Sequence, residues 1–180
     1  MTAQRKLAKG LVQVYTGNGK GKTTASLGLV FRALGHGFRI HVMQFMKGQT
    51  TYGELESAKQ FADRLTIEQV GLPKFVKQGK QTSVDREMAR KALARAQTIV
   101  TSGDYDLVVL DELNCALDFA LVELDAVKEL IRTKAVHTEL VITGRNVLPD
   151  IVELADLVTE MREIKHYYNA GQAARVGIES

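Results

Sequence analysis

Leu11-Val-Gln-Val-Tyr-Thr-Gly-Asn-Gly-Lys-Gly-Lys-Thr-Thr24 is the stretch that decides the fold. Its first part, Leu11–Tyr15, is rich in β-branched and aromatic residues and predicts a short strand. A glycine-rich turn follows. Beyond the turn, apolar residues at positions i, i+3, i+4 and i+7 predict a helix with one apolar face; they are Leu27, Val30, Phe31 and Leu34. This order of strand, glycine loop and helix is typical of α/β proteins.

The glycine loop has the chemistry of an anion site. The usual phosphate-loop pattern is G-x-x-x-x-G-K-[ST], and here the first glycine falls one place late, at Gly17. Glycines let consecutive N–H groups point inward, and the positive end of the next helix adds to their field. Lys22 and Lys20 supply cations, and the Thr23 hydroxyl can bind Mg²⁺. The residues expected to bind phosphate are Thr16, Gly17, Asn18, Gly19, Lys20, Gly21, Lys22, Thr23 and Thr24. The alternative is a strand-to-helix turn without a ligand.

Strands and helices alternate along the rest of the chain. Further strands are predicted at residues 38–45, 65–70, 106–110, 139–143 and 157–161, and helices at 52–62, 82–103, 123–132 and 170–175. Thr82 and Asp85 form a candidate capping box, and Asn146 is a candidate cap for a helix with Pro149 in its first turn. Because residues 106–110 are nearly all apolar, we expect an α/β fold with a mostly parallel sheet covered by helices on both faces.

Length and composition limit the class of protein. The chain has 180 residues, which predicts a single domain over 1–180, and its 45% apolar and 25% charged residues exclude a disordered or collagen-like chain. It contains no run of about 18 apolar residues, so we expect no transmembrane helix. The net charge of +3 is small and the basic residues are scattered. We therefore expect no nucleic-acid partner, and a solvated helix face at Arg86–Arg95.

The single cysteine and the first residues indicate the compartment. Cys115 by itself excludes an internal disulfide or a cysteine zinc cluster, and we expect it to pack in the core of a cytoplasmic protein. Residues 1–10 carry basic side chains, but no apolar stretch follows, so they do not read as a secretory signal. We expect them to form a mobile N-terminal segment.

Two adjacent carboxylates end the apolar strand. Asp111 and Glu112 are costly at a buried strand end unless they meet cations. Opposite a phosphate loop, they predict a Mg²⁺ site in which one carboxylate binds the ion and the other orients the nucleophile or the metal shell. The alternative is that they cap the next helix. Arg145, after a later strand, is a second candidate to hold phosphate, with a plain turn or a subunit contact as alternatives. His36, His41, His137 and His166 lack metal-ligand spacing, so we expect surface or hydrogen-bonded polar roles for them.

The stretch Tyr15–Thr24 resembles the phosphate loop of the ATP:corrinoid adenosyltransferases, which act on cobalamin and cob(I)yrinic acid a,c-diamide. The late first glycine is a trait of that family. The resemblance covers about residues 10–179, and the loop and the C-terminal block are its specific parts. Further matching segments are Arg32–Gly37, Gln44–Gly48, Asp106–Asn114, Ile142–Asn146, Glu153–Glu160, Ile164–His166 and Ala170–Gly171.

The resemblance implies a RecA-like P-loop domain that works as a homodimer. It implies that Gly17–Thr24 hold the triphosphate of ATP, bound in the reverse of the usual sense, and that Thr23 and Glu112 match the family's magnesium ligands. The substrate is then a reduced corrinoid such as cob(I)alamin or cob(I)yrinic acid a,c-diamide, supplied by an electron donor protein or other reductant. Its Co(I) attacks the 5′-carbon of ATP and triphosphate leaves. Lys20 and Lys22 suit the role of neutralising that leaving group.

One loop departs from the family pattern. Some members place two aromatic residues, two apart, after the third strand, where they help to displace the lower ligand of cobalt. Here Leu72 and Lys74 occupy those positions, and Phe75 is adjacent. Phe75 either serves in a shifted register or packs against the core. This loop therefore leaves the preferred corrinoid open, whereas the ATP side follows the family.

Two other functions remain compatible with the residues alone. A P-loop ATPase or kinase would cleave the γ-phosphate of ATP, with Glu112 positioning water or Asp111 on the metal. A non-catalytic module would bind ATP or corrinoid and report its level to a partner. Product analysis separates the first from an adenosyltransferase, and tight binding without turnover under strong reductant would favour the second.

Overall fold

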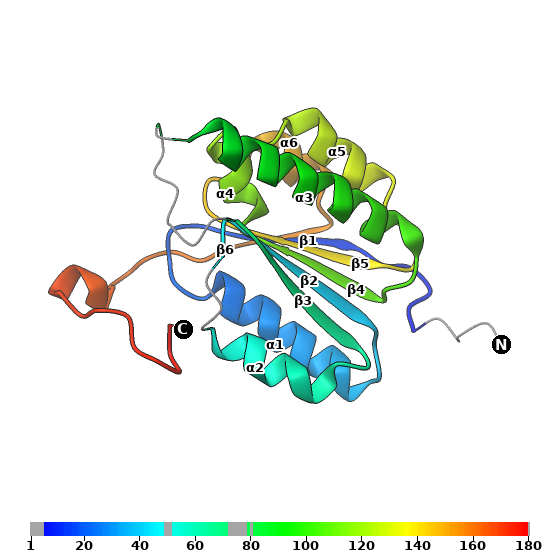
Figure 1. Ribbon diagram of the computed structural model, residues 1–180, viewed down its shortest axis with the longest axis horizontal. Coiled ribbons are helices and arrows are strands. Elements are labelled where there is room, and N and C mark those ends of the chain that lie inside the picture. Colours follow the sequence, from blue (N-terminus) through cyan, green and yellow to red (C-terminus); the bar gives the residue numbers. More distant parts are fainter. Residues whose placement is uncertain (1–5, 49–51, 72–78, 80, 180) are drawn as a thin grey trace.

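The strands of the protein form one parallel sheet. The computed structural model describes residues 6–48, 52–71, 79 and 81–179. In this part of the chain six strands pair in the order β3-β2-β4-β5-β1-β6, and every neighbouring pair is parallel (Figure 1). The strands are β1 (Val12–Thr16), β2 (Ile40–Phe45), β3 (Leu65–Val70), β4 (Leu107–Asp111), β5 (Glu139–Thr143) and β6 (Leu157–Glu160).

Helices cover both faces of this sheet. On one face lie α1 (Lys22–Gly35), α2 (Gly53–Ala58) and the 3-10 helix η1 (Lys59–Phe61). On the other lie α3 (Ser83–Ser102), α4 (Leu113–Asp118), α5 (Leu124–Arg132) and α6 (Pro149–Leu154) (Figure 1). A second 3-10 helix, η2 (Tyr167–Ala170), follows β6. The predicted α/β fold with a parallel sheet between two helical layers is confirmed.

Side-chain alternation along β4 explains the two layers. Val108 and Leu110 pack into the core cluster beneath α3–α6, whereas Leu107 and Val109 pack into the cluster beneath α1. All four side chains are almost completely buried. An apolar side chain at every position is therefore what a strand buried on both faces requires. By contrast, β6 is an edge strand whose four residues are exposed.

Local signals predicted α3 correctly. The capping box is present: the Asp85 amide donates to the Thr82 hydroxyl (3.2 Å) and the Asp85 carboxylate accepts from the Thr82 amide (2.8 Å). Val84, in the first turn of the helix, is 51% exposed. The core face instead consists of Ala89, Ala92, Leu93, Ala96 and Val100. Along the expected solvated face, Arg86, Arg90, Lys91 and Arg95 are exposed.

Two further predictions of local structure were wrong, and one short helix was not predicted. Helix α4 was not predicted, because six residues are too few to show a helical period. Leu148, not Asn146, precedes α6, and Asn146 adopts a left-handed conformation (φ 55°) while its amide donates to Asp118 (2.9 Å). The helical turn of the tail is η2 rather than residues 170–175, and Gly171 ends it with φ 85°.

The N-terminal residues that the structure describes contact the body of the domain. The Leu7 carbonyl lies 3.0 Å from Nδ1 of His137, and the Gly10 amide donates to the Val136 carbonyl (2.8 Å). A Cβ at Gly10 would lie 2.1 Å from the Thr138 carbonyl oxygen, so this position requires glycine. Among the described helices, none is long and apolar enough to cross a membrane.

His41 in β2 is buried without the polar partners that we expected. It is 1% exposed, and neither ring nitrogen makes a hydrogen bond within the described part of the chain. Its ring meets the Tyr105 ring edge-on, and Nε2 lies 3.6 Å from Glu68, which Arg95 also pairs with. Burial lowers the pKa of His41 below its ordinary value of 6.5, and Glu68 offsets this only in part. The folded protein therefore favours neutral His41.

We expect acid to destabilise the fold through His41. In the unfolded chain the ring takes up a proton as the pH falls through about 6.5, whereas the folded chain resists protonation until a lower pH, so stability is lost in that interval. His41→Gln should reduce the loss of unfolding free energy between about pH 7.5 and 5.5, measured by urea denaturation. His36→Gln, at the exposed end of α1, is the control and should keep the wild-type difference. Equal pH dependence in His41→Gln and wild type would contradict this account.

Candidate functional site

The segment that follows β6 packs against the glycine loop between β1 and α1. The Gly19 amide donates to the Met161 carbonyl at 2.7 Å. A Cβ at Gly17 would lie 2.4 Å from the Met161 carbonyl oxygen, and one at Gly19 would lie 2.8 Å from the carbonyl oxygen of Arg162. Gly17 also has φ 93°. Glycine is therefore required here both by this close packing and by the left-handed backbone at Gly17.

Lys22 opens α1 and lies inside the loop. Its ammonium donates to the carbonyls of Gly17 (2.6 Å) and Gly19 (2.8 Å), and the residue is only 7% exposed. Burial lowers the pKa of Lys22 from its ordinary value, while Glu112 opposes that shift. The loop thus surrounds a desolvated cation at the positive end of a helix, which is a favourable place for a phosphate.

Asp111 links four elements at the carboxyl end of β4. It is fully buried, and its Oδ1 accepts hydrogen bonds from the hydroxyls of Thr23 (2.8 Å) and Thr143 (2.7 Å). Its Oδ2 accepts from the ammonium of Lys47 at 2.9 Å. Both carboxylate oxygens are therefore occupied by groups from α1, β5 and the loop after β2.

Glu112 leaves the strand and enters the pocket. It adopts a left-handed conformation (φ 63°) at the start of α4, and its amide donates to Thr143 Oγ1 at 3.0 Å. The side chains of Asp111 and Glu112 point in different directions because the backbone turns at Glu112. Asp111 thus lies behind the site, and Glu112 lines the pocket.

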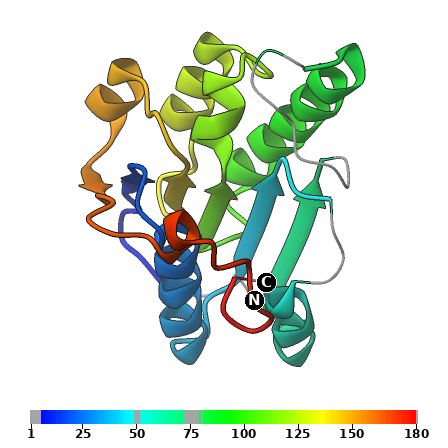
Figure 2. The same cartoon turned by 90° about the vertical axis from the view of Figure 1, so that its left-hand side faces the viewer.

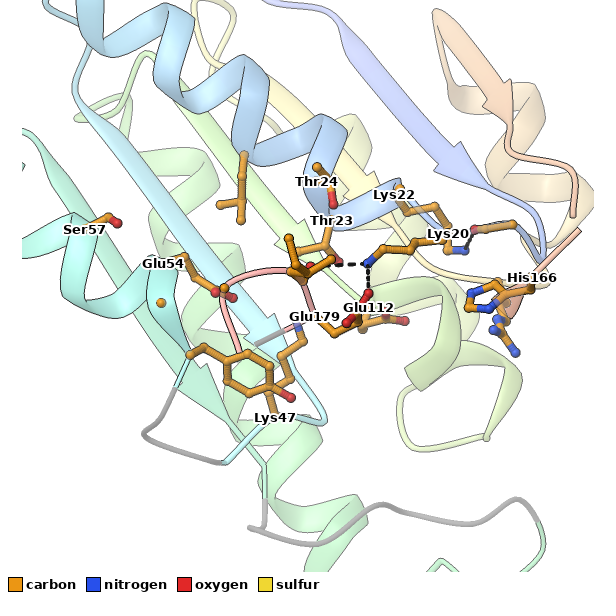
Figure 3. A pocket seen from close by; sticks show the side chains of 18 residues that line it. Lys20, Lys22, Thr23, Thr24, Lys47, Glu54, Ser57, Glu112, His166 and Glu179 are labelled. Atoms are coloured by element: carbon orange, nitrogen blue, oxygen red, sulfur yellow. Dashed lines mark hydrogen bonds and ion pairs between the residues drawn. The ribbon is translucent and has the colours of Figure 1, made fainter. Parts of the chain in front are cut away.

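The pocket has a volume of about 660 Å³ and opens at the carboxyl ends of the strands, beside the start of α1. Figure 3 shows Lys20 pointing into it, Lys22 turned toward the carbonyls of the glycine loop, and Lys47 on the side opposite Lys22. The predicted residues that line it are Gly19, Lys20, Gly21, Lys22, Thr23, Thr24, Glu112 and Arg145. Thr16 and Asp111 are buried behind it, Gly17 contributes its carbonyl to Lys22, and Asn18 is exposed.

The expectation that Cys115 packs in the core was wrong. The side chain is half-buried beside the site, where its Sγ accepts a hydrogen bond from the Arg145 amide at 3.2 Å. Burial, with the nearby Glu112 carboxylate, raises the pKa of the thiol to about 12. Cys115 is therefore a neutral thiol that helps to shape the turn carrying Arg145.

Several pocket residues were not predicted. Tyr52, Gly53, Glu54 and Ser57 form the wall at α2. Glu54 is fixed by a chain of hydrogen bonds, because Gln44 donates to it (2.9 Å) and Gln69 donates to Gln44 (3.0 Å). The pairing of β2 with β3 produces this chain, and the sequence gives no local sign of it.

The C-terminal segment forms another wall that was missed. Figure 2 shows this segment, in red, passing in front of the start of α1. Glu179 lies 3.7 Å from the Lys20 ammonium, which also donates to the Ile178 carbonyl at 3.5 Å. Hydrogen bonds from Tyr167 and Arg175 lower the pKa of Glu179 to about 2. A charged carboxylate therefore holds the tail against the phosphate loop.

The fold defines a P-loop domain of the RecA-like type. Among solved structures the chain is similar to a KaiC-like protein, PH0186, from Pyrococcus horikoshii OT3, with a TM-score of 0.54. The sequence identity is 16%, and the match covers 87% of this chain and 75% of that one, so the likeness concerns the fold.

Sequence comparison identifies the family. Residues 8–180 match the family described as ATP:corrinoid adenosyltransferase BtuR/CobO/CobP. The chain is 38% identical over 177 residues to a corrinoid adenosyltransferase of Pseudomonas aeruginosa, covering 98% of this chain and 87% of the relative. It is 39% identical over 173 residues to one from Sinorhizobium sp, covering 95% and 80%. The chain belongs to the ATP:corrinoid adenosyltransferase family and is a transferase; the resemblance read from its motifs is confirmed.

We expect Lys22→Ala to weaken ATP binding. Hydrogen bonds to charged groups contribute about 1.5–3 kcal/mol, so the dissociation constant for MgATP should rise at least about tenfold in isothermal titration. Lys91→Ala is a matched control, since that lysine lies on the exposed face of α3 and pairs with Glu87. Unchanged ATP affinity in Lys22→Ala would refute the assignment of the phosphate loop.

Proposed function

We propose that the pocket beside α1 binds ATP and directs transfer of its 5′-deoxyadenosyl group to the Co(I) of a reduced corrinoid, with release of triphosphate. The observation that carries this proposal is the set of cations on a phosphate loop, within a chain of this family. Lys20 and Lys22 come from the loop and Arg145 from the turn after β5. The proposal assigns the loop residues Gly17–Thr24 to the triphosphate.

The transfer makes one bond and breaks one. The electron pair of Co(I) forms the cobalt–carbon bond at the 5′-carbon, and the bond from that carbon to the triphosphate oxygen breaks. Cobalt becomes formally Co(III), and the triphosphate leaves with the electron pair of the broken bond. Because Co(I) is already nucleophilic, the protein's task is to position the two reactants and to stabilise the departing negative charge. We assign the second task to Lys22 and Lys20.

A magnesium ion fits the oxygen atoms beside the loop. The Thr23 hydroxyl donates a hydrogen bond to Asp111, so the lone pairs of the Thr23 oxygen are available to a cation. Glu112 lines the same pocket. The described residues contain no group of three or more His, Cys, Asp or Glu side chains suited to a metal, so we infer that nucleotide and water oxygens complete the shell. Bound magnesium would neutralise charge on the triphosphate. We propose Thr23 and Glu112 as its ligands, with Asp111 behind Thr23.

The corrinoid side of the reaction remains a proposal from the family. Leu72, Lys74 and Phe75, the candidates for that side, lie outside the described residues. We propose cob(I)alamin or cob(I)yrinic acid a,c-diamide as the substrate class, reduced by an electron donor, and a homodimer working in the cytoplasm. One domain of this size has little surface left to enclose a large corrinoid ring once it has formed the ATP pocket. A second subunit could supply the missing surface, which favours the dimer.

Product analysis tests the function directly against γ-phosphate cleavage. ATP and Mg²⁺ are incubated with the protein under strong reductant, with and without a cob(I) corrinoid, and the products are separated by ion-exchange chromatography. We expect triphosphate, formed only when the corrinoid is present. Release of ADP and phosphate at equal rates in both mixtures would instead identify an ATPase, and tight ATP binding without any product would identify a non-catalytic module.

We expect Glu112→Gln to raise the Mg²⁺ requirement. Substitution of groups around a protein metal site typically costs 10- to 100-fold in affinity, so the Mg²⁺ concentration for half-maximal triphosphate release should rise about tenfold or more. Glu87→Gln, on the exposed face of α3, provides the control with the same change of charge. An unchanged Mg²⁺ titration in Glu112→Gln would argue against its role as a ligand.

A further inference from the structure

Lys47 has no part in the phosphate-loop or acidic-strand motifs, yet its ammonium occupies a central position in the site. Nζ lies 2.9 Å from Oδ2 of Asp111, and the two side chains are 17% and 1% exposed. It also lies 5.3 Å from the centre of the Tyr52 ring, a cation–π distance. A positive charge from the loop after β2 is thus fixed beside the carboxylate that accepts a hydrogen bond from the Thr23 hydroxyl.

The backbone around Lys47 is built to hold it there. Met46 adopts a left-handed conformation (φ 58°), which is uncommon for a residue with a side chain. At the end of the neighbouring strand β3, a Cβ on Gly71 would lie 2.8 Å from the Lys47 amide nitrogen and from the Met46 carbonyl carbon. The turn after β2 therefore packs directly on Gly71, and this packing directs Lys47 back over the edge of the sheet toward Asp111.

The partners of Asp111 leave little capacity for a further cation. Oδ1 accepts hydrogen bonds from two hydroxyl groups, and Oδ2 accepts one from the ammonium of Lys47. A metal ion that approached Oδ2 would have to displace a charge already paired in a buried position, and would meet repulsion from that ammonium. On the pocket side, the Glu112 carboxylate interacts with the charges of Lys22 and Lys47 only at longer range, and no ion pair holds it within the part of the chain that the structure describes.

We propose that Lys47 is a positioning residue: it acts as a built-in counter-cation that excludes metal ions from Asp111, so that Asp111 orients the Thr23 hydroxyl and the nucleotide's magnesium is held from the pocket side. This role rests on the proposed function, because it concerns the metal that accompanies ATP. It assigns the two adjacent carboxylates different tasks, orientation for Asp111 and metal binding for Glu112.

Manganese binding to the full-length protein without nucleotide tests the exclusion. Free Mn²⁺ is measured by electron paramagnetic resonance during titration of the wild type, Lys47→Met, Lys47→Arg and the double variant Lys47→Met with Asp111→Asn. Removal of the ammonium exposes a carboxylate oxygen, so Lys47→Met should bind Mn²⁺ about tenfold more tightly than wild type, a gain of about 1.4 kcal/mol. Lys47→Arg keeps the charge, and the double variant removes both charges, so these two should match the wild type.

A second measurement covers the case in which Lys47→Met fails to fold because Asp111 is left buried and unpaired. The double variant replaces the ion pair with neutral groups, a change that is often tolerated. In the presence of ATP it should keep Mn²⁺ affinity within about threefold of wild type, while Glu112→Gln should lose about tenfold or more.

Three results would overturn the proposal: no gain of Mn²⁺ affinity in a folded Lys47→Met, an equal gain in Lys47→Arg, or a tenfold loss with ATP in the double variant. The last result would make Asp111 a metal ligand. These readouts need no corrinoid and no turnover. Failure of adenosyl transfer therefore leaves them interpretable, and their failure leaves the transfer reaction standing.

Discussion

The buried carboxylate of Asp111 is the constraint on which the site depends. An ionised side chain at the centre of the sheet is costly unless it is paired and hydrogen-bonded. Here the partners come from three directions: Thr23 at the start of α1, Thr143 at the end of β5 and Lys47 after β2. Satisfying one charge therefore fixes the phosphate loop relative to the strands on both sides of β4. The same bonds position the hydroxyl group and the cations that surround the pocket.

The rest of the site follows from how the chain closes around the loop. The segment after β6 packs on Gly17 and Gly19, and the C-terminal segment returns so that Glu179 meets Lys20. Two lysines of the pocket, Lys20 and Lys47, thus pair with carboxylates of the protein. A triphosphate brings several negative charges, and Lys20 is the cation whose present partner lies nearest the surface. A site arranged in this way suits a leaving group that must be held and then released.

The features that the sequence predicted correctly are those that depend on residues close together in the chain. The capping box at Thr82, the apolar strand β4 and the loop around Lys22 all depend on neighbours within a few residues. The contact of Lys47 with Asp111 joins residues 64 positions apart and requires β2 to lie beside β4, and strand order has no local signature. The contact of Lys20 with Ile178 in the C-terminal segment joins residues 158 positions apart. Helix α4 was not predicted because its 6 residues are too few to show a repeating apolar pattern.

We propose that this pocket holds triphosphate as the leaving group of an alkyl transfer to cobalt. The most direct measurement mixes a cob(I) corrinoid anaerobically with ATP, Mg²⁺ and the protein, and follows the cobalt absorbance while triphosphate is quantified. We expect loss of the Co(I) spectrum, appearance of an adenosylcorrinoid, and triphosphate in equal amount. A Co(I) spectrum that persists while ATP is converted to ADP and phosphate would contradict it.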